Sequence, residues 1–394
     1  MNDYRPEEAI RVMKVQEVIM RAMSGKLSWV EAAEVLRWSP RTLRRWRWRY
    51  EKHGYDGLYD RRKRSPSPKR VPMKTAEKVL RLYREEHAGW NVRHFHEKLV
   101  EEHGIKLSYQ WVKCALQAAG LVPKGTRRQP HRRERERRPM KGMLLHVDGS
   151  THEWMPGAGW EPDLMVFMDD ADSEVYDAFF CEEEGTLPTL QGLKTVIGAK
   201  GLFCSLYTDR GSHFFHTPKS GGEVDRNNPT QVGRALAQLG IEHIPSYCPQ
   251  GRGRMERLFG TWQGRLPQEL QRAGIKTVAA ANRYLQEKFI PWHNRKLKVA
   301  PKESENAFVP LGGVDLDAIL CVREERVVSN DNTVSWGKRK LQIGAQEWRG
   351  GLAKCRVKVC EHVDETVSIR HGPRVVGWYD REGKPLEEGR KAAA

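Results

Sequence analysis

The 394-residue sequence has few cysteines and lacks long apolar runs. Its seven cysteines are scattered without a CxxC pair, which argues against a disulfide framework or zinc ribbon and favours reduced thiols. No stretch approaches the roughly 18 apolar residues that a membrane-spanning helix needs, and the first residues show no apolar signal-peptide core. We therefore expect a cytoplasmic protein without membrane association. A hydrophobic content of 39% excludes wholesale disorder, and the length predicts about two to four domains.

Positive charge is abundant, and its excess is confined to the first third of the chain. Residues 1–141 hold 35 Lys and Arg against 17 Asp and Glu, whereas the remaining 253 residues hold 33 against 34. Lys and Arg contacts to phosphates release counterions and drive binding, so this distribution favours a polyanion partner. A charged, solvated surface is the alternative.

Residues 1–60 are predicted to form a helix-turn-helix DNA-binding domain. Ser28–Glu31 is a capping-box pattern that begins one helix, and Ser39 followed by proline begins a second helix over 40–53. The second helix carries the candidate DNA-contacting residues Arg41, Arg44, Arg45, Arg47 and Arg49. A helix, a short turn and an arginine-rich helix are typical of a reader of the DNA major groove. An ordinary helical hairpin with a basic face is the alternative.

Two basic linkers flank a second helical region. The first linker is 61–72, and its Arg61 and Arg62 are expected to contact phosphates along an extended arm. Residues 73–122 are predicted to be a second helical DNA-binding domain. The expected N-caps of its helices are Thr75, Asn91 and Ser108. The second linker, 123–141, is almost purely charged over most of its length, and we expect it to be disordered without DNA.

From residue 142 the pattern changes to alternating strands and helices. Strands are predicted over 142–148, 163–169, 174–181, 202–208 and 241–245. Helices are predicted over 186–199, 230–239 and 252–273. This order describes an α/β layered core, which we place at 142–312. Short strands separated by turn residues over 316–381 predict a small β-barrel, and a polar tail follows at 382–394.

Three acidic residues stand out by their positions in this core. Asp148 and Asp209 each end a predicted strand, and Glu256 lies early in the helix that follows a Gly-rich loop. Acids at strand ends project at the edge where open α/β sheets form their sites. Carboxylate oxygens are hard ligands suited to Mg²⁺ or Mn²⁺, and a pair of such ions can promote phosphodiester chemistry. On spacing alone, the alternative that these acids are surface groups or helix caps stays open.

The stretches that carry these acids are LLHVDGS, LYTDRGSHF and YCPQGRGRMERLFGTWQGRL. In this order they resemble the signature blocks of the DDE transposases of bacterial insertion sequences, in the retroviral-integrase superfamily, nearest its unclassified members. The resemblance extends to the helix-turn-helix and to the segment GYDGLYDRR. It implies an RNase H-like catalytic core whose catalytic and metal-binding residues are Asp148, Asp209 and Glu256, holding two Mg²⁺ ions for which Mn²⁺ can substitute.

The resemblance also implies a function. Such a protein binds the terminal inverted repeats of its element, nicks each end to free a 3′-hydroxyl and joins that end to target DNA. It would act on double-stranded DNA as a homo-oligomer, without a nucleotide cofactor. The alternative is a domesticated transposase that acts as a sequence-specific DNA-binding regulator, against which the intact acid set argues. A plain RNase H-type nuclease would not need two helical DNA readers and a C-terminal barrel.

Two departures from the family pattern concern the third acid. It is separated from Asp209 by 46 intervening residues, which is longer than is common, and residues 216–229 look like an inserted loop. Gln263 stands where many relatives carry Lys or Arg, seven residues after Glu256. The other acids that could serve as the third ligand lie at less suitable positions, because a metal site needs ligands on rigid elements at the correct edge of the sheet. They are Glu223 and Asp225 in a Gly-rich loop and Glu242 at a strand start.

Four histidines lie in the second helical region. They are His87, His94, His96 and His103, and only Cys114 accompanies them. Without a CxxC pair, this set predicts no structural zinc site. Asp169 and Asp170, which end the second predicted strand, are expected either to support the acidic site or to serve as caps.

Overall fold

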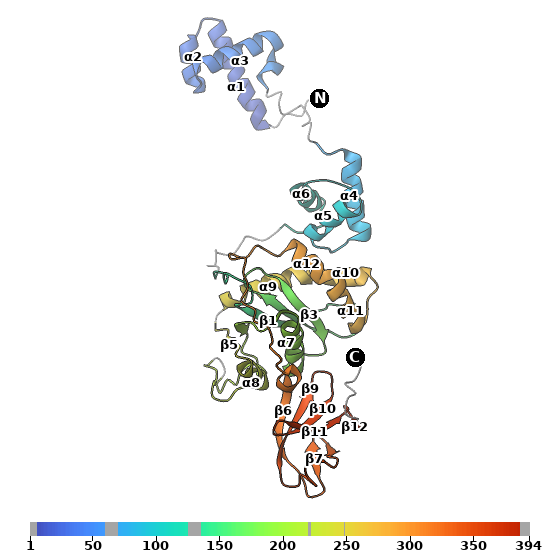
Figure 1. Ribbon diagram of the computed structural model, residues 1–394. Coiled ribbons are helices and arrows are strands. Elements are labelled where there is room, and N and C mark those ends of the chain that lie inside the picture. Colours follow the sequence, from blue (N-terminus) through green and yellow to red (C-terminus); the bar gives the residue numbers. More distant parts are fainter. Residues whose placement is uncertain (1–5, 60–69, 125–134, 220–221, 248, 387–394) are drawn as a thin grey trace. The chain divides into compact units, whose positions relative to one another are not determined.

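The computed structural model describes residues 6–59, 70–124, 135–219, 222–247 and 249–386 (Figure 1). The chain divides into two compact units, Met1–Leu82 and Tyr83–Ala394, and each is described by itself. Arg61 and Arg62 of the first predicted linker lie outside the described residues.

The first unit contains the predicted helix-turn-helix. Its helices are α1 (Pro6–Met23), α2 (Trp29–Leu36), α3 (Pro40–His53) and the short 3-10 helix η1 (Tyr55–Leu58). The predicted capping box at Ser28 and the Ser39 cap with proline in the first turn are confirmed. The sequence did not predict α1, whose Ile19 is fully buried in one cluster with Leu43 of α3. The helix-turn-helix therefore rests on a third helix.

The second helical region consists of α4 (Met73–Glu86), α5 (Val92–Glu101) and α6 (Tyr109–Ala118). Asn91 and Ser108 cap α5 and α6 as predicted. The prediction for Thr75 is wrong: its backbone N–H donates to the carbonyl of Pro72, so the chain is already helical when it reaches Thr75.

A mixed five-stranded sheet forms the centre of the second unit. Its strands are β1 (Leu145–Thr151), β2 (Asp163–Asp169), β3 (Val175–Cys181), β4 (Ser205–Thr208) and β5 (Glu242–Pro245). They lie in the order β3-β2-β1-β4-β5. The first three pair antiparallel, whereas β4 pairs in parallel with both β1 and β5. The predicted order of three strands followed by alternating helices and strands is confirmed.

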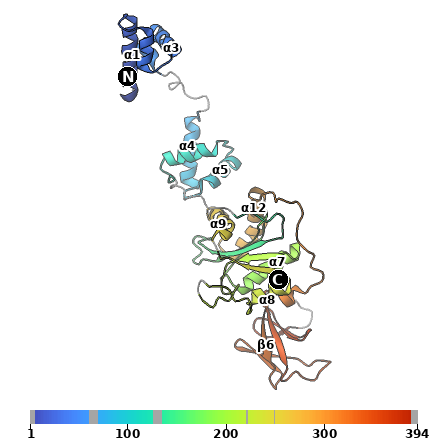
Figure 2. The ribbon, with the colours of Figure 1, turned by 90° about the vertical axis from the view of Figure 1, so that its left-hand side faces the viewer.

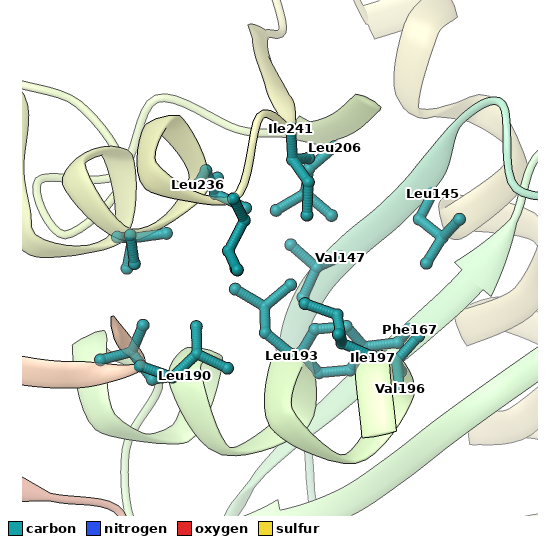
Figure 3. Close-up of a cluster of buried hydrophobic side chains, with 14 of the residues drawn as sticks. Leu145, Val147, Phe167, Leu190, Leu193, Val196, Ile197, Leu206, Leu236 and Ile241 are labelled. Carbon is teal, nitrogen blue, oxygen red and sulfur yellow. The ribbon is translucent and has the colours of Figure 1, made fainter. Parts of the chain in front are cut away.

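Helices cover both faces of this sheet (Figures 1 and 2). On one face lie α7 (Thr186–Lys200) and α8 (Gln231–Gln238). Figure 3 shows Leu193 and Leu236 from these helices packing around Val147 of β1. Because side chains alternate along a strand, His146 and Asp148 project to the opposite face.

The opposite face is covered by helices from the end of the core. They are α9 (Pro249–Gln263), α10 (Leu266–Arg272), α11 (Val278–Tyr284), the π-helical turn η3 (Leu285–Phe289) and α12 (Ile290–Lys296). The single helix predicted over 252–273 is wrong, because the chain breaks between α9 and α10. Arg265 has a non-helical backbone, and Pro267 in the first turn of α10 cannot continue the preceding helix.

The C-terminal part of the second unit is built from antiparallel strands. A short helix α13 (Leu316–Ile319) precedes β6 (Cys321–Val327), β7 (Thr333–Trp336), β8 (Arg339–Gln342), β9 (Arg356–His362), β10 (Val367–His371), β11 (Arg374–Tyr379) and β12 (Pro385–Leu386). The sheets are β12-β11-β10-β9-β6 and β7-β8, around one apolar core. The expected strands are present, but no pairing among the described residues closes them into the expected barrel.

Among the described helices, none combines the length and apolar character needed to cross a membrane.

Candidate functional site

Two acids lie side by side on neighbouring parallel strands, where β4 ends. Asp148 is in the middle of β1, and Asp209 directly follows β4. The prediction that Asp148 ends its strand is wrong, because β1 continues to Thr151 by pairing with β2. Leu145 pairs with Leu206 across these strands, and the same register carried three residues further places Asp148 beside Asp209. This is the sheet edge at which open α/β folds assemble their sites.

The guanidinium of Arg252, on α9, joins the two acids. Its Nη2 donates to Oδ1 of Asp148 at 2.5 Å, and its Nη1 lies 3.8 Å from Oδ2 of Asp209. The helix starts this close to the sheet because residue 251 is glycine. A Cβ there would lie only 1.9 Å from the hydroxyl oxygen of Tyr207 on β4. The sequence analysis missed Arg252, whose signal was the alternation of Gly and Arg ahead of Glu256.

The environment of Asp148 disfavours its charged form. Burial raises the pKa of Asp148 to about 7 from its ordinary 3.8, and the negative charges of Glu184 and Asp209 add to this, while Arg252 opposes it. The Asp148 side chain is only 9% exposed. A buried carboxylate beside other carboxylates, balanced by a single guanidinium contact, would be stabilised by a divalent cation. The oxygen-only donor set suits Mg²⁺.

The side chain of Glu256 is exposed. Among the described residues of α9, it is Arg252 and not Glu256 that contacts Asp148. The helix face nevertheless places Glu256 toward the acids. At 3.6 residues per turn, Arg252, Glu256 and Gln263 fall within about 40° of one another around α9. Arg252 contacts Asp148, and Nε2 of Gln263 lies 3.3 Å from Oγ of Ser150 further along β1. Glu256 therefore belongs to the α9 face that runs along the end of β1.

The buried positions of α9 agree with this orientation. The apolar residues predicted to anchor the helix are all buried in the cluster beneath the sheet: Met255, Leu258, Phe259 and Trp262.

The competing acids are placed differently. Glu242 pairs with Ser205 at the start of β4, the end of the strand opposite to Asp209. Asp225 is occupied within its own loop, where it accepts hydrogen bonds from the backbone of Asn227 and the side chain of Asn228. Glu223 is exposed in the same loop.

Asp170, fully buried directly after β2, is the centre of an ionic network at the start of α9. Its Oδ1 accepts from His146 at 2.8 Å and from Arg254 at 2.6 Å, and it also pairs with Arg135. The backbone of Arg138 donates to Oδ2 at 2.8 Å. Burial by itself would raise the pKa of Asp170, but these partners hold it below its usual range. The expectation that the second linker is disordered is wrong for 135–138, because Asp170 binds this segment.

The arginines predicted to contact DNA divide into two groups. Arg41, Arg44 and Arg45 are exposed on α3. Arg47 pairs with Glu51 at 2.7 Å and lies over a tryptophan ring of α2, and Arg49 lies over the ring of Trp46. The exposed group covers one side of the helix, opposite the buried Leu43.

The histidines of the second helical region are mostly occupied by other contacts. His94 bonds to Glu269, and His96 to the carbonyl of Leu107. Potential ligand atoms of His87, Glu102 and His103 lie within 4.8 Å of one another. Both carboxylate oxygens of Glu102, however, already accept from Arg272, at 3.0 and 2.6 Å.

Two family models match the N-terminal third of the chain, and their matches overlap. Residues 16–67 match a family described as a helix-turn-helix domain, and residues 42–116 match a homeodomain-like domain.

Two curated relatives match most of the chain. A candidate transposase of Sinorhizobium fredii, y4bF, is 29% identical over 358 residues, which cover 90% of this chain and 77% of the relative. The transposase for insertion sequence IS1202 of Streptococcus pneumoniae is 28% identical over 358 residues, covering 82% of this chain and 76% of the relative.

Solved structures also match. The HTLV-2 integrase catalytic core domain in complex with magnesium is 15% identical, with a TM-score of 0.30, and the match covers 42% of this chain and 93% of that one. A chain of the simian T-cell lymphotropic virus intasome, in complex with a PP2A regulatory subunit, is 14% identical, with a TM-score of 0.33, covering 79% and 100%.

Proposed function

We propose that this chain moves its own element, because it is similar over most of its length to two insertion-sequence transposases and matches helix-turn-helix families. It binds the terminal inverted repeats of that element and catalyses metal-dependent 3′-end cleavage and strand transfer into target DNA. The observation that carries this proposal is the meeting of Asp148 and Asp209 around one guanidinium, where β4 ends beside β1.

Asp148, Asp209 and Glu256 are the residues that would hold the two Mg²⁺ ions, for which Mn²⁺ can substitute. Bound there, such ions polarise the scissile phosphate and activate the attacking water or 3′-hydroxyl. Arg252 balances the charge of the acid pair in the metal-free protein, and bound cations would take over this role. The network around Asp170 holds the start of α9, and through it the position of Glu256.

The exposed arginines of α3 read the ends, and the second helical region positions the DNA. We expect the active form to be a homo-oligomer on DNA, because two ends of one element must be processed together.

The first test is Asp148→Asn in the full chain with DNA that carries the inverted repeats flanking its gene. The carboxamide keeps the shape but loses the charge that holds the ions, so end binding in a gel assay should persist while nicking and strand transfer disappear. Excess EDTA should have the same effect on the unaltered protein. If the unaltered protein binds the ends and never nicks them in Mg²⁺ or Mn²⁺, the DNA-binding regulator is the correct function.

The third acid is tested separately, with controls from the same core. Glu256→Gln should eliminate strand transfer, because Glu256 shares a face of α9 with Arg252, the residue that contacts Asp148. Glu242→Gln and Glu223→Gln should retain most activity, because one lies at the wrong end of the sheet and the other in an exposed loop. A dead Glu242→Gln beside an active Glu256→Gln would refute this assignment.

A further inference from the structure

Glu184 brings an additional carboxylate to β1, next to Asp148. It lies between β3 and α7, and its carboxyl group packs against Gly149, the residue that follows Asp148. A Cβ built on Gly149 would lie 2.2 Å from Oε2 and 2.6 Å from Cδ of Glu184. The missing side chain of Gly149 therefore leaves the space that this carboxylate fills. Asp148 projects to the other face of the strand, so the two carboxylates flank the same strand.

The side chain of Glu184 is held beside β1 by contacts at its backbone and at its carboxylate. Its backbone N–H donates to Asp163 at 2.8 Å, which fixes the chain at this point. Its Oε1 is buried and accepts no hydrogen bond from the described residues. His213 lies beside it: its Nε2 is 3.5 Å from Oε1 and is likewise buried without a hydrogen bond in the described part of the chain. The Glu184 side chain is 24% exposed, but its Oε1 is buried and has no hydrogen-bond donor among the described residues, which leaves this oxygen able to bind a cation.

The same contacts connect Glu184 to the second acid. A Cβ built on Gly211 would lie 3.1 Å from both Oδ1 of Asp209 and Cε1 of His213, so these two side chains flank the same glycine. The negative charge of Glu184 also acts on Asp148 and on Arg252. A chain of neighbouring groups thus leads from Gly149, the residue next to Asp148, through Glu184 and His213 to Asp209.

We propose that Glu184 is a fourth carboxylate of the metal site, which binds a divalent cation together with Asp148 and is oriented by His213. This inference rests on the proposed function, because it concerns the same ions. It adds an oxygen ligand from the α7 side of the sheet, opposite the α9 side that carries Glu256. It also gives a reason for glycine at position 149, where any side chain would displace this ligand.

The test is Mn²⁺ binding to the full chain without DNA, measured by calorimetry and by the electron paramagnetic resonance signal of free Mn²⁺. Glu184→Gln should weaken Mn²⁺ binding about tenfold or more, or remove one ion. Gly149→Ala should do the same, because the new methyl group displaces the carboxylate while every residue of the site remains. Glu183→Gln is the matched control, since this neighbour is exposed and should bind Mn²⁺ as the unaltered protein does.

Thermal unfolding in EDTA separates ligation from a purely structural role, because a lost ligand leaves the metal-free protein folded. The inference is overturned if Glu184→Gln binds Mn²⁺ with unchanged affinity and number of ions. A different outcome would contradict the proposed function: Asp148→Asn would bind Mn²⁺ with the same affinity as the unaltered protein. Loss of binding in Asp148→Asn with full binding in Glu184→Gln would reject the fourth ligand alone.

Discussion

At the scale of single residues, α3 shows how one helix divides its arginines between DNA and its own domain. Arg41, Arg44 and Arg45 are spaced three and four residues apart and are exposed on one face. Arg49 turns back over the ring of Trp46 at 5.2 Å, so its guanidinium contributes a cation–π contact within the domain. Residues near the start of a recognition helix are the ones that reach base edges. The exposed group is therefore the better candidate for reading sequence.

Arg44→Ala should lower discrimination between the cognate end and random DNA, by about 1–3 kcal/mol if a bidentate guanine contact is lost. Arg49→Ala is the matched control on the same helix. It should lower the thermal stability of the domain and leave discrimination unchanged. Competition binding with cognate and scrambled duplexes measures both variants. Equal discrimination by Arg44→Ala and the unaltered protein would contradict this division of roles.

At the scale of elements, α9 is the helix that connects the buried network to the acidic site. Arg254 on its first turns is buried against Asp170, while Arg252 and Glu256 occupy the face toward β1. Arg254 thereby fixes the rotation of α9 about its own axis. The last residues of the second linker are bound to the same acid, so the linker ends where the active-site helix begins.

Asp170→Asn should destabilise the protein and misplace α9. The amide leaves Arg254 and Arg135 facing a neutral group in a buried site, a change that costs about 3–5 kcal/mol in comparable buried networks. Strand transfer should fall as well, because α9 carries Glu256. Chemical denaturation and a strand-transfer assay check the two effects, with the exposed Glu325→Gln on β6 as control. Unchanged stability in Asp170→Asn would show that the network does not hold the helix.

A second element-scale contact joins α5 to α10. Oε1 of Glu269 lies 2.7 Å from His94 and 3.0 Å from Lys98. Burial by itself would raise the pKa of Glu269, but these two partners lower it to about 2. Burial lowers the pKa of His94, although Glu269 opposes that shift. The native contact therefore uses a neutral histidine and an ionised glutamate.

This contact should weaken in acid. A carboxyl group with a lowered folded pKa contributes its full stability above its unfolded pKa of 4.5, and the contribution is lost as the pH falls toward about 2. Glu269→Gln should therefore destabilise the protein by about 1–3 kcal/mol at pH 7, and this difference should shrink between about pH 4.5 and pH 2. Denaturant unfolding across this range measures it. A difference that stays constant down to the lowest pH would contradict the ionic contact.

Features that depend on neighbouring residues could be predicted from the sequence, whereas contacts between residues far apart in the chain could not. The strand over 163–169 and the caps at Ser28 and Ser39 depend on neighbouring residues, and they were predicted correctly. The contact of Arg252 with Asp148 spans 104 residues, and no local pattern encodes it. The approach of Glu184 to Gly149 is equally non-local. The start of β1 was placed too early because apolar residues precede the paired segment.

At the scale of the whole molecule, the excess positive charge and the acids of the candidate site lie in different parts of the chain. The excess of Lys and Arg lies in residues 1–141, and the remainder is balanced. The acids of the candidate site all belong to the balanced part. Sequence-independent affinity for DNA should therefore come from the basic third, and the salt dependence of binding should report on that part of the chain alone.

The linker arginines test this separation. Replacing Arg61 and Arg62 together by Ala should lower the affinity for cognate and random DNA by the same factor, because phosphate contacts carry no sequence information. Each lost contact should reduce the slope of log K against log salt by about 0.9. Fluorescence anisotropy over a series of salt concentrations measures the slope. Arg326→Ala is the control: Arg326 is exposed on β6 in the balanced part and paired with Glu324, so the slope should not change. An equal change of slope in both variants would show that DNA binding is not confined to the basic third.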